Sequence, residues 1–269
     1  LEHTENLVQP SVKRKTLTIS PWMYAAAMVV IVFFCGMIAF QSGKRVLRNQ
    51  LTQITVEAPY GSKTKLYLPD GTLVWLNAGS KMSYAQDFGI NERSLNLSGE
   101  AYFEVSKDPK HPFIVQTETI DVQVLGTHFN VDAYHDNLDV KTTLLSGSVA
   151  VSNKSKSVRM VLKPNEIAIY NKVEEKLTRK VLENAEDEIS WRQGEFIFDD
   201  LPLQEIAREL SNSFGATIQI ADTTLQNYRI TARFRNGEDL ATILSVLHNA
   251  GYFDYSQNNK QIIITAKPD

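Results

Sequence analysis

Chemically capable side chains occur in this 269-residue chain, but their spacing does not assemble a reaction site. Gly61-Ser62-Lys63-Thr64 resembles the end of a phosphate-binding loop, yet Glu57 stands where that motif requires its first glycine. No helical pattern follows, so we expect a turn before a strand. Ser146-Gly147-Ser148 lacks the spacing of a nucleophile elbow and predicts a tight turn between strands.

The five histidines and the many carboxylates do not indicate a metal or acid–base site either. His128 and His135 could approach each other in a sheet, but no two histidines have ligand spacing on a helix. The only cysteine, Cys35, lies inside an apolar run. Asp132 and Asp136 could be paired, although such pairs are usually solvated loop residues. The sequence therefore predicts no catalytic, cofactor-binding or metal-binding residue, and no enzyme.

The strongest physical signal is an apolar run over residues 16–43, which contains no Asp, Glu, Lys, Arg or His. A helix over residues 21–40 would be about 30 Å long, the thickness of the hydrocarbon core of a bilayer. The run predicts a single transmembrane anchor, with aromatic rings at one interface. The residues expected to form it include Pro21, Trp22, Tyr24, Val30, Phe33, Phe34 and Phe40.

Two other interpretations of this run are a buried helix of a soluble core and a cleaved signal peptide. A signal peptide is disfavoured because no small–x–small triplet ends the run. Clusters of three cations flank it on each side, so the positive-inside rule does not choose an orientation. The net charge of −3 offers no basic field for nucleic acid, and we expect no direct nucleic-acid binding.

After a linker over residues 44–56, the hydrophobic period changes to two, as in half-buried strands. Short alternating runs over residues 57–171 are separated by turn signals such as Pro69-Asp70-Gly71. Many short strands at this spacing predict an all-β domain. The pattern is compatible with a sandwich and with a curled, solenoid-like sheet.

A second linker over residues 172–190 leads to a different pattern over residues 191–269. Strand and helix signals follow in the order β-α-β-β-α-β-β, which predicts a small α+β domain with two helices on one face of a sheet. Asp199 or Asp200 is expected to cap the first helix, with Pro202 in its first turn. Exposed edges of the sheet could accept a strand from a partner. The candidate residues, in the runs 228–234 and 261–265, are Tyr228, Ile230, Ala232, Phe234, Ile262 and Ile264.

Several ordered motifs resemble the FecR family of membrane-anchored sigma-factor regulators. They are LPDGTLVWLNAGS (68–80), LSGEAYFEV (97–105), HPFIV (111–115), VLGTHFNV (124–131) and LSGSV (145–149). The tail resembles the C-terminal domain that follows FecR domains in Bacteroidota-type proteins. This likeness lies in Trp191, Gly194, Phe196, Phe198, Leu203, Ile206 and Leu210. That domain in turn looks like the signalling domain of TonB-dependent transducers.

The resemblance implies a single-pass inner-membrane protein with its bulk in the periplasm. Its partners would be an extracytoplasmic-function sigma factor on the cytoplasmic side and an outer-membrane TonB-dependent transporter. It would regulate uptake of iron or polysaccharide. Family members usually have a longer head than residues 1–15, so either the native chain extends further or direct sigma binding has been lost.

Two other functional classes remain open from the residues alone. An anchored periplasmic module that binds carbohydrate or cell wall could use Trp75, Tyr84 and Tyr102 as stacking platforms, if these rings are exposed. An anchored hydrolase is the weakest alternative, because no nucleophile and base can be named.

Overall fold

The computed structural model describes residues 22, 28, 31–38, 53–90 and 92–267. The chain divides into two compact units, Leu1–Leu51 and Thr52–Asp269. In the first unit, residues 31–38 are helical, and the side chains of Phe33 and Phe34 are exposed, as is that of Trp22. Within the described ranges, no helix is both long enough and apolar enough to span a bilayer. Most of the expected anchor lies outside the described residues, including Pro21, Tyr24, Val30 and Phe40, and so does the head.

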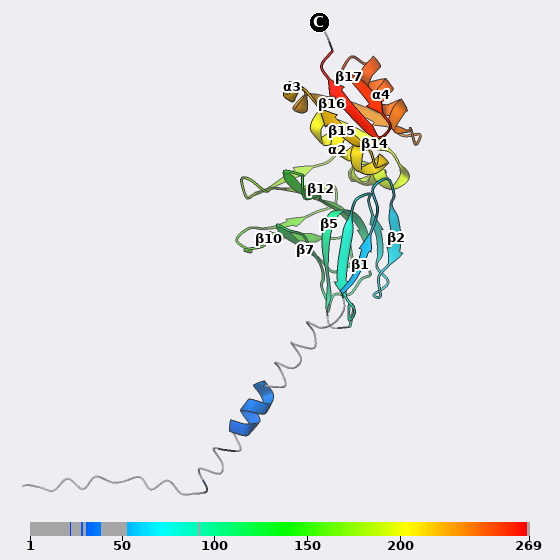
Figure 1. Cartoon of the computed structure of the whole chain (residues 1–269). Coiled ribbons are helices and arrows are strands. Elements are labelled where there is room, and N and C mark those ends of the chain that lie inside the picture. The colour runs from blue at the N-terminus through cyan, green and yellow to red at the C-terminus, as the bar shows by residue number, and fades with distance from the viewer. Residues whose placement is uncertain (1–21, 23–27, 29–30, 39–52, 91, 268–269) are drawn as a thin grey trace, which may run out of the picture. The chain divides into compact units, whose positions relative to one another are not determined.

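The second unit begins with a 13-stranded sheet that folds over on itself (Figure 1). Its strands are β1 (Gln53–Glu57), β2 (Thr64–Tyr67), β3 (Leu73–Leu76), β4 (Lys81–Ala85), β5 (Arg93–Glu104), β6 (Phe113–Gln116), β7 (Ile120–Val124), β8 (His128–Ala133), β9 (Asp139–Ser146), β10 (Val149–Asn153), β11 (Arg159–Leu162), β12 (Glu166–Asn171) and β13 (Lys176–Val181). The main path runs β11-β10-β7-β6-β5-β8-β9-β12-β13, and β5 also pairs with β3 and β4. The first strand thus starts at Gln53, inside the stretch expected to be a linker.

The fold is a β-sandwich, which decides between the two architectures that the sequence left open. One layer contains β6, β7 and β10, the other contains β8, β9 and β12, and β5 belongs to both. Alternating side chains of both layers meet in one buried core. Phe103 of one layer stacks on Phe129 at 5.0 Å and meets Phe113 of the other layer edge-to-face at 5.9 Å. Burial of these period-two side chains holds the layers together.

Gly99 marks the point at which β5 passes from one layer to the other. Up to Ser98 the strand pairs with β4, whereas from Ala101 onward it pairs with β3. Gly99 has a φ of 101°, and a Cβ built on it would lie 2.7 Å from Ser80 Cα. Any other residue would therefore collide with the neighbouring backbone in a strained conformation.

A buried ion pair ties the predicted Pro69-Asp70-Gly71 turn to the loop that precedes β6. Arg93 is 2 % exposed, and its guanidinium lies 3.2 Å from the Asp70 carboxylate. The same guanidinium donates hydrogen bonds to the carbonyl oxygens of Ser106 at 2.7 Å and His111 at 2.8 Å. Because these acceptors satisfy the buried charge, Arg93 is a structural residue.

The stretch expected to be a second linker is ordered against the sandwich. It contains β13, which pairs with β12, and then the 3₁₀ helix η1 (Ala185–Gln193). Asn184 caps this helix by accepting a hydrogen bond from the backbone N–H of Glu186. Ile189 and Trp191 are buried in a small cluster with Tyr102 of β5. Apolar packing therefore fixes the segment that leads into the C-terminal domain.

The C-terminal domain has the expected order of elements, with one additional short helix. Its elements are β14 (Phe196–Pro202), α2 (Leu203–Phe214), β15 (Thr217–Ile220), α3 (Thr223–Gln226), β16 (Arg229–Phe234), α4 (Leu240–Asn249), β17 (Asp254–Asn258) and β18 (Gln261–Thr265). The apolar stripes of α2 and α4 are buried with strand residues in a second core. Gly215 ends α2 in the left-handed conformation, and the Asp239 side chain caps α4.

Two details of this domain differ from the expectation. Its strands form two small sheets, β14-β16 and β15-β18-β17, instead of one. The residue at the N-cap of α2 is Pro202, with no side-chain cap, so the capping role predicted for Asp199 or Asp200 is wrong. The reason is that β14 continues through Asp199 and Asp200 to Pro202 and leaves no turn in which either could cap the helix.

Candidate functional site

The motifs considered for chemistry occupy ordinary structural positions. Gly61 to Lys63 form the turn before β2, as predicted. His135 lies 3.0 Å from the Glu118 carboxylate and His111 lies 2.8 Å from that of Asp108, both near the surface. In the part of the chain that the structure describes, no three His, Cys, Asp or Glu side chains are grouped to hold a metal ion. Asp132 lies near Glu100, and both side chains line one pocket. The sequence had suggested Asp136 as the possible partner of Asp132 and gave no sign of this pocket.

The candidate partner strands differ in accessibility. β18 lies between β15 and β17, so the expectation of an open edge at residues 261–265 is wrong. Ile262 and Ile264 are buried in the core. β16 pairs only with β14 and keeps one unpaired edge among the described strands. Its inward side chains, Ile230 and Phe234, are buried, Ala232 is partly buried, and Tyr228, just before it, is 44 % exposed.

The aromatic platforms expected of a carbohydrate-binding module are not exposed. Tyr84 and Tyr102 are buried, and the Arg192 guanidinium covers the ring of Tyr102 at 3.9 Å. Trp75 is partly buried under the Lys65 ammonium group at 4.8 Å. These rings therefore pack against protein and cations, and none offers the open face that a sugar requires.

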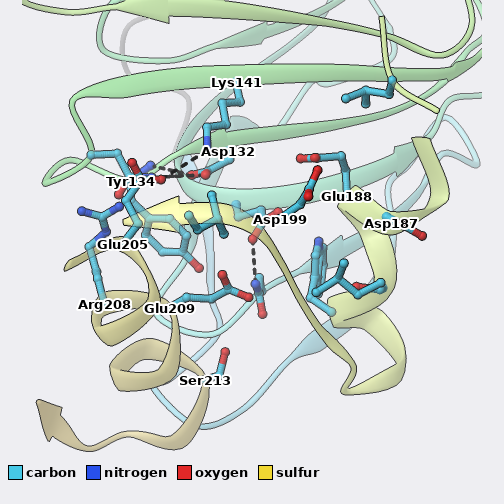
Figure 2. A pocket seen from close by; sticks show the side chains of 18 of the residues that line it. Asp132, Tyr134, Lys141, Asp187, Glu188, Asp199, Glu205, Arg208, Glu209 and Ser213 are labelled. Atoms are coloured by element: carbon cyan, nitrogen blue, oxygen red, sulfur yellow. Dashed lines mark hydrogen bonds and ion pairs between the residues drawn. The ribbon is translucent and has the colours of Figure 1, made fainter. Parts of the chain in front are cut away.

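A pocket of about 380 Å³ lies between the sandwich, η1 and the C-terminal domain. Glu100 of β5, Asp132 of β8 and Lys141 of β9 reach it from the sandwich. Figure 2 shows Lys141 and Asp132 on one side, Glu188 from η1 on another, and Glu205, Arg208 and Glu209 projecting from α2. Three structural regions therefore place their polar side chains in a common space.

Amide groups hold the carboxylates at the sandwich side of the pocket. Asn77 donates to one Glu100 oxygen at 2.7 Å, and Asn130 donates to the other at 2.8 Å. Burial raises the pKa of Glu100 well above its usual range, and the neighbouring Asp132 carboxylate raises it further. Asn137 donates to both oxygens of Asp132 at 3.0 and 3.2 Å. Burial also raises the pKa of Asp132.

The side of the pocket formed by α2 and η1 contains less completely satisfied carboxylates. Lys141 Nζ lies 3.4 Å from Glu205 Oε2 and links the sandwich to α2. Burial raises the pKa of Glu209 to about 7, and the Asp132 carboxylate contributes to this rise. Burial also raises the pKa of Glu188. These acids therefore release their protons at a higher pH than ordinary surface carboxylates do.

Chemically, this arrangement suits binding and proton storage. Its described lining includes neither a Cys nucleophile nor a His, the usual base that activates a nucleophile. No pattern in the sequence could have identified the pocket, because its residues come from eight strands and helices, and the loops between them, spread between residues 77 and 233. Asn77, Glu100 and Trp191 do fall within the motifs that resemble a known family, although nothing in those motifs indicates a shared site.

Comparisons with known proteins match both domains in order. The model of the FecR protein family matches residues 54–150, and that of the FecR C-terminal domain matches residues 195–264, together more than half of the chain. The chain belongs to the FecR family of anti-sigma regulators. No curated protein matches it at a significant level.

Solved structures support the same assignment. Two crystal structures of a proposed anti-sigma factor from Parabacteroides distasonis, at 1.65 and 2.50 Å, each superpose on this FecR-family chain with a TM-score of 0.75 and 28% identity. The matches cover 80% and 81% of this chain and 100% of each of those chains. The likeness thus spans both the sandwich and the C-terminal domain.

Proposed function

We propose that this protein is a membrane-anchored anti-sigma regulator that relays a signal from an outer-membrane TonB-dependent transporter to an extracytoplasmic-function sigma factor. The observation that carries the proposal is the ordered match of both FecR-family domains. The apolar run over residues 16–43 supplies the inner-membrane anchor, with the sandwich and C-terminal domain on the periplasmic side.

In this proposal the C-terminal domain receives the signal and the sandwich transmits it toward the anchor. The contacts between them support such coupling. The Gly61 N–H donates to the Asn212 carbonyl oxygen at 2.9 Å, and Lys141 pairs with Glu205. Gly61 lies just after β1, which is the first described strand after the anchor. A change at α2 therefore has a short covalent and hydrogen-bonded route to the start of the sandwich.

A sigma-dependent reporter tests the proposal directly. The full chain is produced in cells that contain its cognate sigma factor, with and without the transporter and inducer. We expect the chain to alter reporter output, the inducer to reverse that change, and the sigma factor to co-purify with the membrane fraction. An unchanged reporter together with no sigma factor in the purified complex would contradict the proposal.

A further inference from the structure

The connection between β16 and α4 contains the one Asn-Gly pair of the whole sequence, Asn236-Gly237. Both residues are exposed, and neither belongs to the strand or to the helix. Gly237 has a φ of 70°, and nothing lies within 4 Å of a Cβ built on it. Because glycine has no side chain, nothing on Gly237 itself shields its backbone nitrogen. The Asn236 side chain and the next peptide nitrogen are therefore both open to solvent.

The hydrogen bonds of this pair leave its two reactive atoms unengaged. In the part of the chain that the structure describes, the Gly237 N–H donates to no acceptor. Glu238 accepts the Asn236 backbone N–H at 3.0 Å and the Asn236 Nδ2 at 3.2 Å. These bonds engage the side-chain nitrogen of Asn236 but neither its Cγ nor the nitrogen of Gly237.

The Asp-Gly pair of the sandwich shows how the fold protects a similar dipeptide. Gly71 also has a positive φ, of 82°, but its N–H donates to the Leu68 carbonyl oxygen at 2.9 Å. The Asp70 side chain is 8 % exposed and lies 3.2 Å from the Arg93 guanidinium. Its Oδ1 accepts the backbone N–H of Thr72 at 3.0 Å. Both reacting partners are thus engaged in the turn at Gly71, whereas the loop at Gly237 leaves them free.

We propose that Asn236 is a site of spontaneous deamidation through a cyclic succinimide, with water as the co-reactant. The Gly237 nitrogen forms a bond to Asn236 Cγ, the Cγ–Nδ2 bond breaks, and Nδ2 leaves as ammonia with the proton that Gly237 loses. Water then opens the ring. Opening at Cγ leaves an aspartyl residue, whereas opening at the main-chain carbonyl carbon leaves an isoaspartyl residue linked to Gly237 through Cγ. No atom is oxidised or reduced.

Both products change the connection that leads into α4. Each places a new carboxylate three residues before Asp239, the N-cap of α4, where a negative charge is favourable beside the positive end of a helix. The isoaspartyl product also inserts Cβ into the main chain and lengthens the link between β16 and α4. This chemistry needs only the loop itself and does not depend on the relay to a sigma factor.

Incubation of the purified full chain in mildly alkaline buffer tests the proposal, because base promotes removal of the Gly237 proton. We expect the proteolytic peptide that contains residues 236–237 to shift in mass from amide to acid. The same peptide should accept methyl groups from a protein isoaspartyl methyltransferase. Asn249-Ala250 is the internal control, because Asn249 is exposed but the Ala250 N–H donates to the Val246 carbonyl oxygen at 2.9 Å. Its peptide should stay unchanged.

Conservative variants assign the reaction to Asn236. Asn236→Gln keeps the amide but requires a larger ring, and we expect it to lose the isoaspartate signal. Gly237→Ala shields the attacking nitrogen and should slow the mass shift, while Asn249→Gln should convert as the parent does. Thermal melting checks that each variant is folded. An unchanged 236–237 peptide in the parent, equal conversion at Asn249, or an undiminished isoaspartate signal in Asn236→Gln would each overturn the proposal.

Discussion

The backbone N–H of Gly61 donates a hydrogen bond of 2.9 Å to the carbonyl oxygen of Asn212. This bond joins the turn after β1 to the last turn of α2, and Gly215 at the end of α2 packs against the same turn. Figure 1 shows α2 and β14 on the side of the C-terminal domain that faces the sandwich. The sandwich and the C-terminal domain are therefore connected both just after the end of β1 and at the charged pocket.

Replacement of Gly215 tests whether this contact stabilises the pair of domains. A Cβ on Gly215 would lie 3.4 Å from the Tyr60 carbonyl oxygen, whereas nothing lies within 4 Å of one on Gly237. Both glycines have positive φ, so Gly215→Leu and Gly237→Leu share a conformational cost of about 1 kcal/mol. We expect Gly215→Leu to lower the free energy of unfolding by at least about 1 kcal/mol more, because of overpacking. Equal losses in urea denaturation would show that the contact contributes nothing.

Removal of the buried Arg93 charge should be severely destabilising. Arg93→Met leaves Asp70 as an uncompensated buried carboxylate and removes the donor from several loop carbonyls. We expect a loss of about 3–5 kcal/mol in the free energy of unfolding. Lys81→Met is the control, because the Lys81–Glu57 pair is exposed at 2.7 Å and such pairs contribute about 0–1 kcal/mol. Urea denaturation of both variants measures the contrast, and similar losses would refute it.

The protonation of Glu209 predicts a specific pH dependence. Its pKa rises from the usual 4.5 to about 7 in the folded state, mainly by burial, so the folded chain binds this proton more tightly than the unfolded chain. The contribution to stability is fully present below pH 4.5 and is lost as the pH rises through about 7. Asp132, Glu188, Lys141 and Arg208 face the same group and modulate the shift.

The variant Glu209→Gln should match the parent near pH 4.5 and exceed its stability at pH 8. We expect a gain of about 1 kcal/mol, which corresponds to a rise in melting temperature of about 2–4 °C. Solvent in the pocket screens the charge and keeps the gain modest. Melting curves at several pH values provide the measurement. A difference that does not change with pH would show that Glu209 is not the titrating group.

The unpaired edge of β16 is the remaining candidate for strand addition by the transporter that we propose as a partner. Successive N–H groups of a strand point to opposite edges. One of the two variants Ala232→Pro and Arg233→Pro therefore removes an N–H donor at the free edge of β16, and the other removes a donor that faces β14. We expect the outward variant to keep its melting temperature and bind the signalling domain of the transporter at least about tenfold more weakly. If that variant binds as the parent does, β16 is not the docking edge.

Charge insertion into the apolar run tests the anchor. Phe33→Arg combined with Phe34→Arg places two guanidinium groups in a segment whose described side chains are exposed and apolar. Each central Arg costs about 2.5–3.5 kcal/mol of insertion, so we expect the variant to leave the membrane fraction. Phe33→Leu with Phe34→Leu is the apolar control and should remain there. Fractionation followed by immunoblotting distinguishes the two, and equal recovery of both variants in the membrane would argue against a spanning helix.

Local patterns of this sequence determined the type and order of most elements. The period-two runs around Val74, Phe103 and Phe129 predicted strands, because alternate side chains of a strand face one core. The helical spacing of Leu203, Ile206 and Leu210, followed by Gly215, predicted α2 to its last residue. These signals are short-range and depend only on neighbouring residues.

Tertiary structure alone decided the sandwich, the interior position of β18 and the charged pocket. Strand alternation is the same in a sandwich and in a solenoid, because it records which side chains are buried and not which strands pair. Glu100 and Glu209 are separated by more than a hundred residues, and nothing near either indicates that they will share a buried space. Only the approach of η1 and α2 to β5, β8 and β9 around one pocket takes these carboxylates out of bulk water, and that desolvation raises their pKa.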